Sequence, residues 1–260
     1  MKRWKNIKTS LPPLFLFLIF IMTWELVSYL IQIPAYILPA PSVISRSLLA
    51  NVNLLAHHAG TTLTAVAGGM VLAIFTAILL AIAMDRWKSL KQALYPILVV
   101  SQAVPIFALA PLMMIWFGVG LTPKILIVAL VCFFPLAVNL VEGFSQVDPE
   151  ATDLLKIMQA DKWMIMKSVQ LPTAMPYFFS GLKIAATYSV LGAIIGEWLG
   201  ARSGLGIYML RAMNSFRTGD VFASIAVVIL LSLTLFKIVE SSGRLAMPWK
   251  KETLNHKEER

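Results

Sequence analysis

"TTLTAVAGGMVLAIFTAILLAIAM", residues 61–84, is an apolar run without a single charged side chain. A helix that crosses a membrane needs about 20 mostly apolar residues, so this run is long enough to cross one. Small residues recur along it at every fourth position: Ala65, Gly69, Ala73, Ala77 and Ala81. A spacing of four places them on one side of a helix, and the segment is therefore predicted to be a membrane helix with one smooth side.

A second apolar segment, 176–198, carries the same kind of stripe, formed by Gly181, Ala185, Ser189 and Ala193. Small side chains let the backbones of membrane helices approach closely, which is how such helices gain packing contacts. Two interpretations follow. The stripes either pack the helices of one bundle together, or one of them lines a dimer seam or a gate.

The composition of the whole chain agrees with a membrane protein. Hydrophobic residues make up 58% and charged residues 13%, about half the charged share of a soluble domain. Six segments are apolar enough to cross a membrane: 12–33, 61–84, 94–117, 122–142, 176–198 and 220–242. We therefore expect an all-α integral membrane protein with six transmembrane helices in one domain, 1–260, with its core at 61–242.

Lysine and arginine predict the orientation, because cytoplasmic segments are enriched in them. With six spans, one side receives the residues Lys2, Arg3, Lys5, Lys8, Arg86, Lys88, Lys91, Lys156, Lys162, Lys167, Arg244, Lys250, Lys251, Lys257 and Arg260. The other side receives Arg46, Lys124, Arg202, Arg211 and Arg217. Both termini and the segment 145–175 are therefore expected in the cytoplasm. The net charge of +9 is explained by these cytoplasmic segments, and no nucleic-acid partner is expected.

Polar groups inside the apolar segments are candidates for a transport pathway. The segment 94–117 contains Ser101 and Gln102 beside Pro96, Pro105 and Pro111. Each proline removes a backbone donor, and the carbonyls it frees need partners or a water-filled cavity. We therefore expect an interrupted helix that lines a pathway, although each proline could equally be a simple kink.

Two carboxylates also lie in or next to apolar sequence. Glu197 continues the stripe of 176–198, at the end expected to be extracytoplasmic. There it is either functional or paired with another group, or it is solvated at the membrane border. Glu25 lies within the first apolar segment, where two interpretations stay open: contact with a neighbouring helix, or contact with the membrane border.

Motifs for enzyme chemistry are missing from the sequence. It contains no phosphate-binding G-x-x-x-x-G-K-[ST] loop and no nucleophile–base set. Cys132 is the single cysteine, and the adjacent His57 and His58 are interpreted as polar loop residues. We therefore expect neither an enzyme nor a metal site, and no cofactor bound by this chain.

A polar, basic stretch, "DLLKIMQADKWMIMKSVQLPTAMP" (153–176), separates two apolar segments. Asp148-Pro149-Glu150 is typical of a helix start, and Asp161 can cap a second helix. Leu171-Pro172 is expected to end that second helix, since a residue before proline avoids helical geometry. The stretch is thus predicted to form two short helices with a turn near Gln159-Ala160. Their exposed face could dock into a partner or lie on lipid.

The stretch resembles the coupling loop of binding-protein-dependent ABC transporter permeases, whose pattern is E-A-A-x3-G-x9-I-x-L-P. Alignment on Leu171-Pro172 puts Val169 at the isoleucine, Gln159 at the glycine and Asp153-Leu154-Leu155 at Glu-Ala-Ala. The spacing is kept, but Gln159 departs from a glycine that tolerates left-handed geometry.

The resemblance extends along the chain. The stretches "LPAPSVI" (38–44), "QAVPIFALAPLMMIWFGVG" (102–120) and "GLKIAATYSVLGAIIGEWLGARSGLG" (181–206) are similar to permeases for alkanesulfonates, taurine, nitrate and thiamine precursors. The GEWLGA stretch is most similar to permeases for hydroxymethylpyrimidine-type thiamine precursors. The chain is identified as a member of this family, which implies a type I ABC importer permease-like fold in the cell membrane.

The resemblance also implies the partners and the site. A permease homodimer would form the pathway in the lipid bilayer, two ABC ATPase subunits would bind ATP and Mg²⁺, and an extracytoplasmic binding protein would deliver substrate. The coupling residues would be Asp153, Leu154, Leu155, Gln159, Ala160, Asp161, Val169, Leu171 and Pro172. Pathway candidates are Ser101, Gln102, Pro105, Tyr188 and Glu197. The alternatives are the same machine for alkanesulfonate, taurine or nitrate, an ion-driven secondary transporter, and a membrane enzyme.

Overall fold

The computed structural model describes residues 2–249, and for residues 2–11 and 14 it describes the backbone alone. This part of the chain is helical throughout, without a β-strand. The long helices are α1 (Lys2–Leu30), α3 (Val52–Arg86), α6 (Leu121–Ser145), α9 (Leu171–Trp198) and α11 (Thr218–Ala246). The shorter elements are α2 (Pro41–Ala50), α4 (Lys88–Ser101), α5 (Ile106–Phe117), α7 (Pro149–Ile157), α8 (Lys162–Ile165), the π-helix Met166–Gln170 and α10 (Leu205–Asn214).

Four helical segments of the described chain are long and apolar enough to cross a membrane: Val52–Arg86, Leu121–Ser145, Lys162–Trp198 and Thr218–Ala246. The pair α4 and α5 would make a fifth if it counts as one broken span, and the apolar part of α1, Phe15–Leu30, is shorter. Each of the six predicted apolar segments thus corresponds to a helix or a helix pair. The count of six spans and the side on which the termini lie stay predictions.

The third apolar segment is interrupted, as its prolines predict. Helices α4 and α5 meet at an angle of 102° across residues 102–105. Pro105 stands at the N-cap of α5, where its missing N–H removes no helical hydrogen bond. Pro96 and Pro111 lie inside α4 and α5 without ending them. Of the three prolines, only Pro105 therefore lies at the break.

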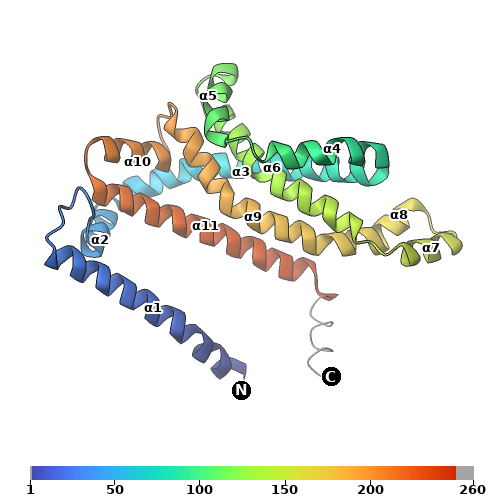
Figure 1. The fold of residues 1–260 in the computed structure, drawn as a ribbon, viewed down its shortest axis with the longest axis horizontal. Helices are drawn as coiled ribbons and strands as arrows, with labels where there is room; N and C mark the ends of the chain where they lie inside the picture. Colours follow the sequence, from blue (N-terminus) through green and yellow to red (C-terminus); the bar gives the residue numbers. More distant parts are fainter. Residues whose placement is uncertain (1, 250–260) are drawn as a thin grey trace.

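Helices α3, α6 and α9 pack closely to form the core, with α9 lying between α6 and α11 (Figure 1). The small residues of both stripes are buried. A Cβ added at Gly69 would come within 2.4 Å of the Val128 side chain on α6, and one at Gly181 within 2.7 Å of the Pro135 carbonyl oxygen. The interpretation of both stripes as packing within one bundle is therefore confirmed, since both face neighbouring helices of the same chain.

Helix α1 runs away from the bundle and is joined to it near its C-terminal end (Figure 1). There the Glu25 carboxylate accepts hydrogen bonds from the backbone N–H of Ser42, at 3.0 Å, and from its hydroxyl, at 2.7 Å. Ser42 lies in the first turn of α2, so Glu25 satisfies a free donor at that helix start. Of its two interpretations, contact with a neighbouring helix is correct.

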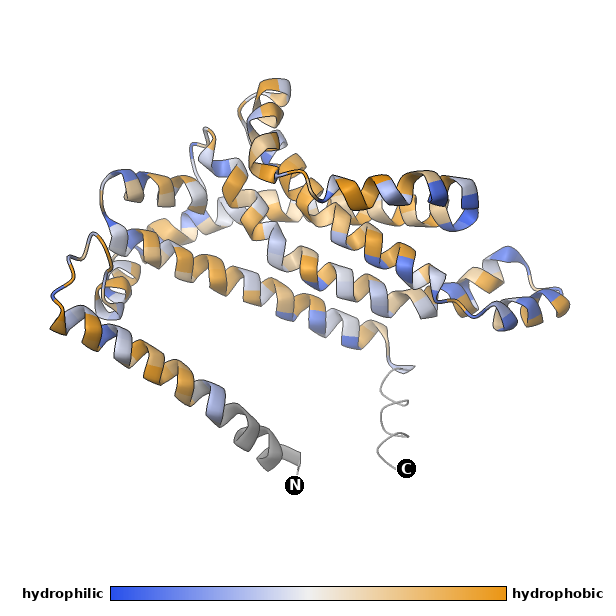
Figure 2. Cartoon of the chain, viewed as in Figure 1, coloured by the Kyte–Doolittle hydropathy of each residue, from blue (hydrophilic) through white to orange (hydrophobic). Residues whose placement is uncertain are grey.

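Hydrophobic and hydrophilic residues are distributed differently along the flanks of the bundle and at its ends. Figure 2 shows hydrophobic residues along most of α11 and the C-terminal half of α1, as expected for helices that face lipid. Hydrophilic residues gather at α7, α8 and the turn between α3 and α4. Because Lys91 Nζ lies 2.5 Å from Ser145 Oγ, that turn and the segment 145–175 share one end of the molecule.

Candidate functional site

The segment 145–175 projects from one end of the bundle as two short helices (Figure 1). The Asp148 carboxylate accepts from the N–H of Glu150 at 2.9 Å, and Pro149 occupies the first turn of α7. The Asp161 carboxylate accepts from the N–H of Met164 at 2.7 Å and caps α8. Both helix starts that the sequence predicts are confirmed, since each aspartate satisfies a donor that the first turn leaves free.

The turn between α7 and α8 is built on Gln159, whose φ of 63° lies in the left-handed region. The N–H of Ala160 donates to the Leu155 carbonyl at 2.9 Å. The N–H of Gln159 donates to the Lys156 carbonyl, also at 2.9 Å. This is the arrangement that ends helices with a left-handed residue, usually glycine. The position therefore requires a left-handed backbone conformation, which glycine adopts without steric cost. Gln159 adopts the same conformation although it carries a side chain.

The expected helix end at Leu171-Pro172 is wrong. Residues Lys162–Trp198 form one continuous apolar helical segment, and Leu171 has helical φ and ψ of −62° and −50°. A π-helical turn, Met166–Gln170, precedes the proline, and the N–H of Leu171 bonds to the Met166 carbonyl. In a regular α-helix, residue 172 would have to donate a backbone hydrogen bond, which a proline cannot do. The wider π turn leaves room for the Pro172 ring and needs no donor at this position.

The continuous helix has a mechanical consequence, because α8 and the core helix α9 are one body. The nine predicted coupling residues all lie on α7, the turn, α8, the π turn or the first turn of α9. Gln170 Nε2 also donates to Asp85 of α3 at 3.3 Å. A displacement of the projecting segment would therefore be transmitted directly to α9 and to the end of α3.

Large apolar side chains on the projecting segment are exposed. Leu154, Ile157, Met158, Trp163 and Met164 form what we call the apolar docking face, each more than half exposed. The charged residues Asp153, Lys156 and Lys162 of the same segment are exposed as well. Exposed apolar groups rimmed by polar residues are typical of a surface that another molecule covers.

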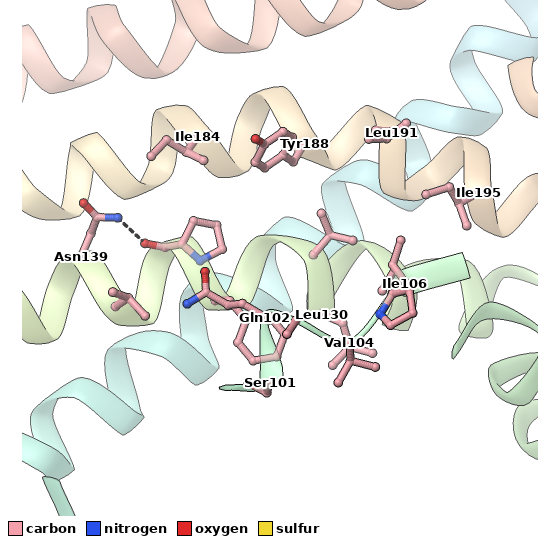
Figure 3. A pocket seen from close by; sticks show the side chains of 16 residues that line it. Ser101, Gln102, Val104, Ile106, Leu130, Asn139, Ile184, Tyr188, Leu191 and Ile195 are labelled. Atoms are coloured by element: carbon pink, nitrogen blue, oxygen red, sulfur yellow. Dashed lines mark hydrogen bonds between the residues drawn. The ribbon is translucent and has the colours of Figure 1, made fainter. Parts of the chain in front are cut away.

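A cavity of about 540 Å³ lies midway along the core, between the α4–α5 break, α6 and α9. Figure 3 shows Gln102 and Ser101 on one side and Tyr188, Ile184 and Leu191 of α9 on the other. The structure thus brings together four predicted pathway residues: Ser101, Gln102, Pro105 and Tyr188. None of the 16 residues that line the cavity is charged.

Asn139 also lines this cavity, and sequence reasoning did not single it out. Its side-chain Nδ2 donates to the Pro135 carbonyl at 2.7 Å, as the dashed line in Figure 3 marks. The available signal was an amide that follows the apolar run 125–138, since polar side chains at membrane depth are usually functional or paired.

Glu197, the fifth pathway candidate, does not line the cavity. It is fully buried, and its carboxylate accepts from Thr62 Oγ1 at 2.9 Å and from the N–H of Gly206 at 2.7 Å. Of its two interpretations, the paired one is correct and the solvated one is wrong. Glu197 joins α3, α9 and the start of α10.

His58 belongs to the same buried group. His57 and His58 both lie within α3, so the interpretation of the two as loop residues is wrong. The Nδ1 atom of His58 accepts from the N–H of Gly204 at 3.0 Å, while Thr62 Oγ1 accepts from the N–H of Leu205 at 2.9 Å. Three consecutive N–H groups at the start of α10 are therefore satisfied by three side chains from α3 and α9.

Comparisons with known proteins agree with this architecture. The family described as "Binding-protein-dependent transport system inner membrane component" matches residues 69–250. A formylaminopyrimidine transport permease of Halalkalibacterium halodurans, ThiX, is 34% identical, over 94% of this chain and 97% of its own. A riboflavin transport system permease of Chloroflexus aurantiacus, RibX, is 34% identical over 89% and 87%. Further relatives carry names for transport of sulfonates, taurine and nitrate.

A solved structure described as an amino acid ABC transporter with histidines has the same fold, with a TM-score of 0.61 at 17% identity, over 76% of this chain and 96% of the other. Fold and site thus define a multi-pass helical transport protein of the cell membrane. The chain belongs to the family of binding-protein-dependent transport system inner membrane components and is the permease subunit of an ABC importer.

Proposed function

We propose that this permease forms the substrate pathway of an ATP-driven importer for a hydroxymethylpyrimidine-type thiamine precursor. Separate ATPase subunits, which bind ATP and Mg²⁺, dock on the segment 145–175. A binding protein delivers the substrate on the extracytoplasmic side. The chain supplies the pathway and the docking surface, and its partners supply the ATP chemistry.

The observation that carries this proposal is the apolar docking face on a segment continuous with the core. A surface helix of this kind fits a groove on a partner, where apolar side chains at helical spacing act as anchors. The projecting helices have few contacts with the rest of the chain apart from the α9 junction. Because α8 continues into α9, closure of the ATPase would tilt the helix that lines one side of the cavity.

A homodimer is proposed for the pathway itself. Three of the four α9 side chains that line the cavity, Ile184, Tyr188 and Leu191, are between 42% and 49% exposed. A second copy facing them would close this open side and enclose a central space between two identical linings. Closed two-fold symmetry is the commonest way in which identical subunits assemble.

The pyrimidine assignment is supported by the relative named for formylaminopyrimidine, which matches nearly the whole chain. The alternative is the same machine for an alkanesulfonate, taurine or nitrate, as other relatives are named. An ion-driven secondary transporter would need no ATPase partner.

Co-purification and vesicle uptake test the proposal. The tagged chain, expressed with the ATPase encoded beside it, should retain that ATPase through detergent extraction and size-exclusion chromatography. Vesicles loaded with ATP should accumulate radiolabelled 4-amino-5-hydroxymethyl-2-methylpyrimidine only when the binding protein is present. Uptake that persists without any ATPase would contradict the proposal, and uptake of taurine in place of the pyrimidine would contradict its substrate.

A further inference from the structure

The cavity between the α4–α5 break, α6 and α9 offers hydrogen-bonding groups but no charge. Its polar side chains are Ser101, Gln102, Asn139 and Tyr188, and its remaining lining is aliphatic apart from the Phe134 ring and two prolines. An anion placed there would lose its hydration without gaining a cationic partner, which costs several kcal/mol. The lining therefore favours an uncharged ligand.

Asn139 contributes a side-chain amide of fixed orientation at one end of this cavity. Its Nδ2 is held by the Pro135 carbonyl at 2.7 Å, so the orientation of the amide is set from within α6. Within the described chain Oδ1 has no hydrogen-bond partner, and Figure 3 shows the side chain at one end of the cavity. A carbonyl oxygen held in this way is suited to an N–H donor, such as an amino group on a ring.

Across the cavity, the Gln102 side chain is exposed and forms no hydrogen bond within the described residues. Ser101 Oγ is already engaged by the Leu98 carbonyl at 2.8 Å. Gln102 thus supplies the second free polar group, with one donor and one acceptor. Because it follows the last residue of α4, its position depends on the break that separates α4 from α5.

Tyr188 contributes an aromatic surface from α9, on the opposite side of the cavity from Gln102. Its ring is about half exposed and faces the cavity from α9, and its hydroxyl has no partner within the described chain. A planar ligand can stack on such a ring, whose face attracts flat aromatic groups. Since α9 continues from the segment 145–175, movement of that segment would change the position of this ring relative to the two amides.

We infer that this cavity is a selectivity site for an uncharged, planar heteroaromatic ring bearing an amino group. The Oδ1 atom of Asn139 accepts from the amino group, the Gln102 amide bonds to a ring nitrogen, and the Tyr188 ring lies against the ring face. The inference rests on the proposed function for its role in transport. It goes beyond that function by naming the residues that would recognise the ring, in a lining that holds no charged side chain.

The test uses the permease in complex with its ATPase, with 4-amino-5-hydroxymethyl-2-methylpyrimidine and taurine as probes. Asn139→Leu should raise the KM for the pyrimidine, and its dissociation constant by equilibrium dialysis, by about tenfold, as the loss of one hydrogen bond predicts. Tyr188→Phe should change the KM and the dissociation constant by no more than about twofold, because the ring remains. Tyr188→Ala should weaken binding by about tenfold, because the ring is lost.

Thr187→Val is the matched control. Thr187 neighbours Tyr188 on α9, does not line the cavity, and bonds only to the Lys183 carbonyl of its own helix, at 3.1 Å. This variant should bind the pyrimidine as the unmodified chain does. Unchanged pyrimidine binding by a folded Asn139→Leu complex, or tighter binding of taurine than of the pyrimidine, would overturn the inference.

Dialysis with the permease alone separates this inference from the proposed function. If no ATPase associates with the chain, the proposed function fails. Binding of the pyrimidine to the isolated chain and its variants still shows whether the cavity is a selectivity site. If the complex assembles and hydrolyses ATP but the variants bind the pyrimidine normally, the inference fails while the importer role stands.

Discussion

The carboxylate of Glu197, fully buried near the end of α9, accepts the backbone N–H of Gly206 at 2.7 Å. Gly206 lies in the first turn of α10, so Glu197 satisfies a donor that the helix start leaves free. A Cβ added at Gly204 would lie 2.1 Å from the Glu197 carboxyl carbon. Gly204 is therefore required by the space that the Glu197 side chain occupies.

Glu197→Ala should destabilise the protein by about 1–3 kcal/mol, because the Gly206 N–H stays buried without a partner. Glu197→Gln should cost less than about 1 kcal/mol, since its oxygen can still accept from Gly206 while its nitrogen donates to Thr62. Thermal stability of the detergent-solubilised protein measures both. A glutamine variant as unstable as the alanine variant would show that the charge of Glu197, rather than its hydrogen bonds, is needed.

Gly69→Ala should separate α3 from α6, because the new Cβ would lie 2.4 Å from the Val128 side chain. We expect a loss of roughly 1–3 kcal/mol, the usual cost of overpacking, seen as a lower melting temperature. Gly60→Ala, on the same helix with nothing within 4 Å of the added Cβ, is the control and should be neutral or stabilising. Equal stability of the two variants would contradict the packing role of the stripe.

Gln159→Gly should be tolerated, since glycine adopts the left-handed conformation at φ 63° without steric cost. Gln159→Val should be damaging, because a β-branched residue at positive φ is strained. Limited proteolysis between α7 and α8 and retention of the ATPase on a column measure both effects. The proposed turn geometry would be contradicted if the valine variant retained ATPase as well as the glycine variant does.

Asp153→Lys should weaken docking of the ATPase without affecting insertion. The Asp153 side chain is 66% exposed, and its ion pair with Lys156, at 2.8 Å, lies on the surface, where such pairs contribute about 0–1 kcal/mol. Lys156→Ala breaks the same ion pair but keeps the carboxylate, so it should retain transport. Pull-down of the ATPase and uptake in vesicles compare the two. Normal uptake by Asp153→Lys would remove this residue from the docking surface.

Local chemistry explains why several features could be predicted from the sequence. Asp148 and Asp161 are caps because a carboxylate before a helix start finds free N–H donors within its own turn. The stripe from Ala65 to Ala81 is recognisable because its period of four matches a helix face. Such features depend on residues close in the chain.

Pro172 shows where local rules fail. The rule that a residue before proline leaves the helix is a statement about a regular α-helix, and the π turn Met166–Gln170 changes the spacing that the rule assumes. Asn139 and Tyr188 come from helices that meet only in the fold, so their shared cavity cannot be inferred from either segment alone.

The sequence by itself determined the membrane class, the apolar segments, the interruption of the segment 94–117 and the capped helices between Asp148 and Ile165, because hydropathy and capping act over short distances. The tertiary structure decided which polar residues meet. It buried Glu197 against Thr62 and the start of α10, apart from the cavity that holds Gln102 and Asn139. The reason is physical: a buried polar group needs a partner, and that partner is chosen by how helices pack.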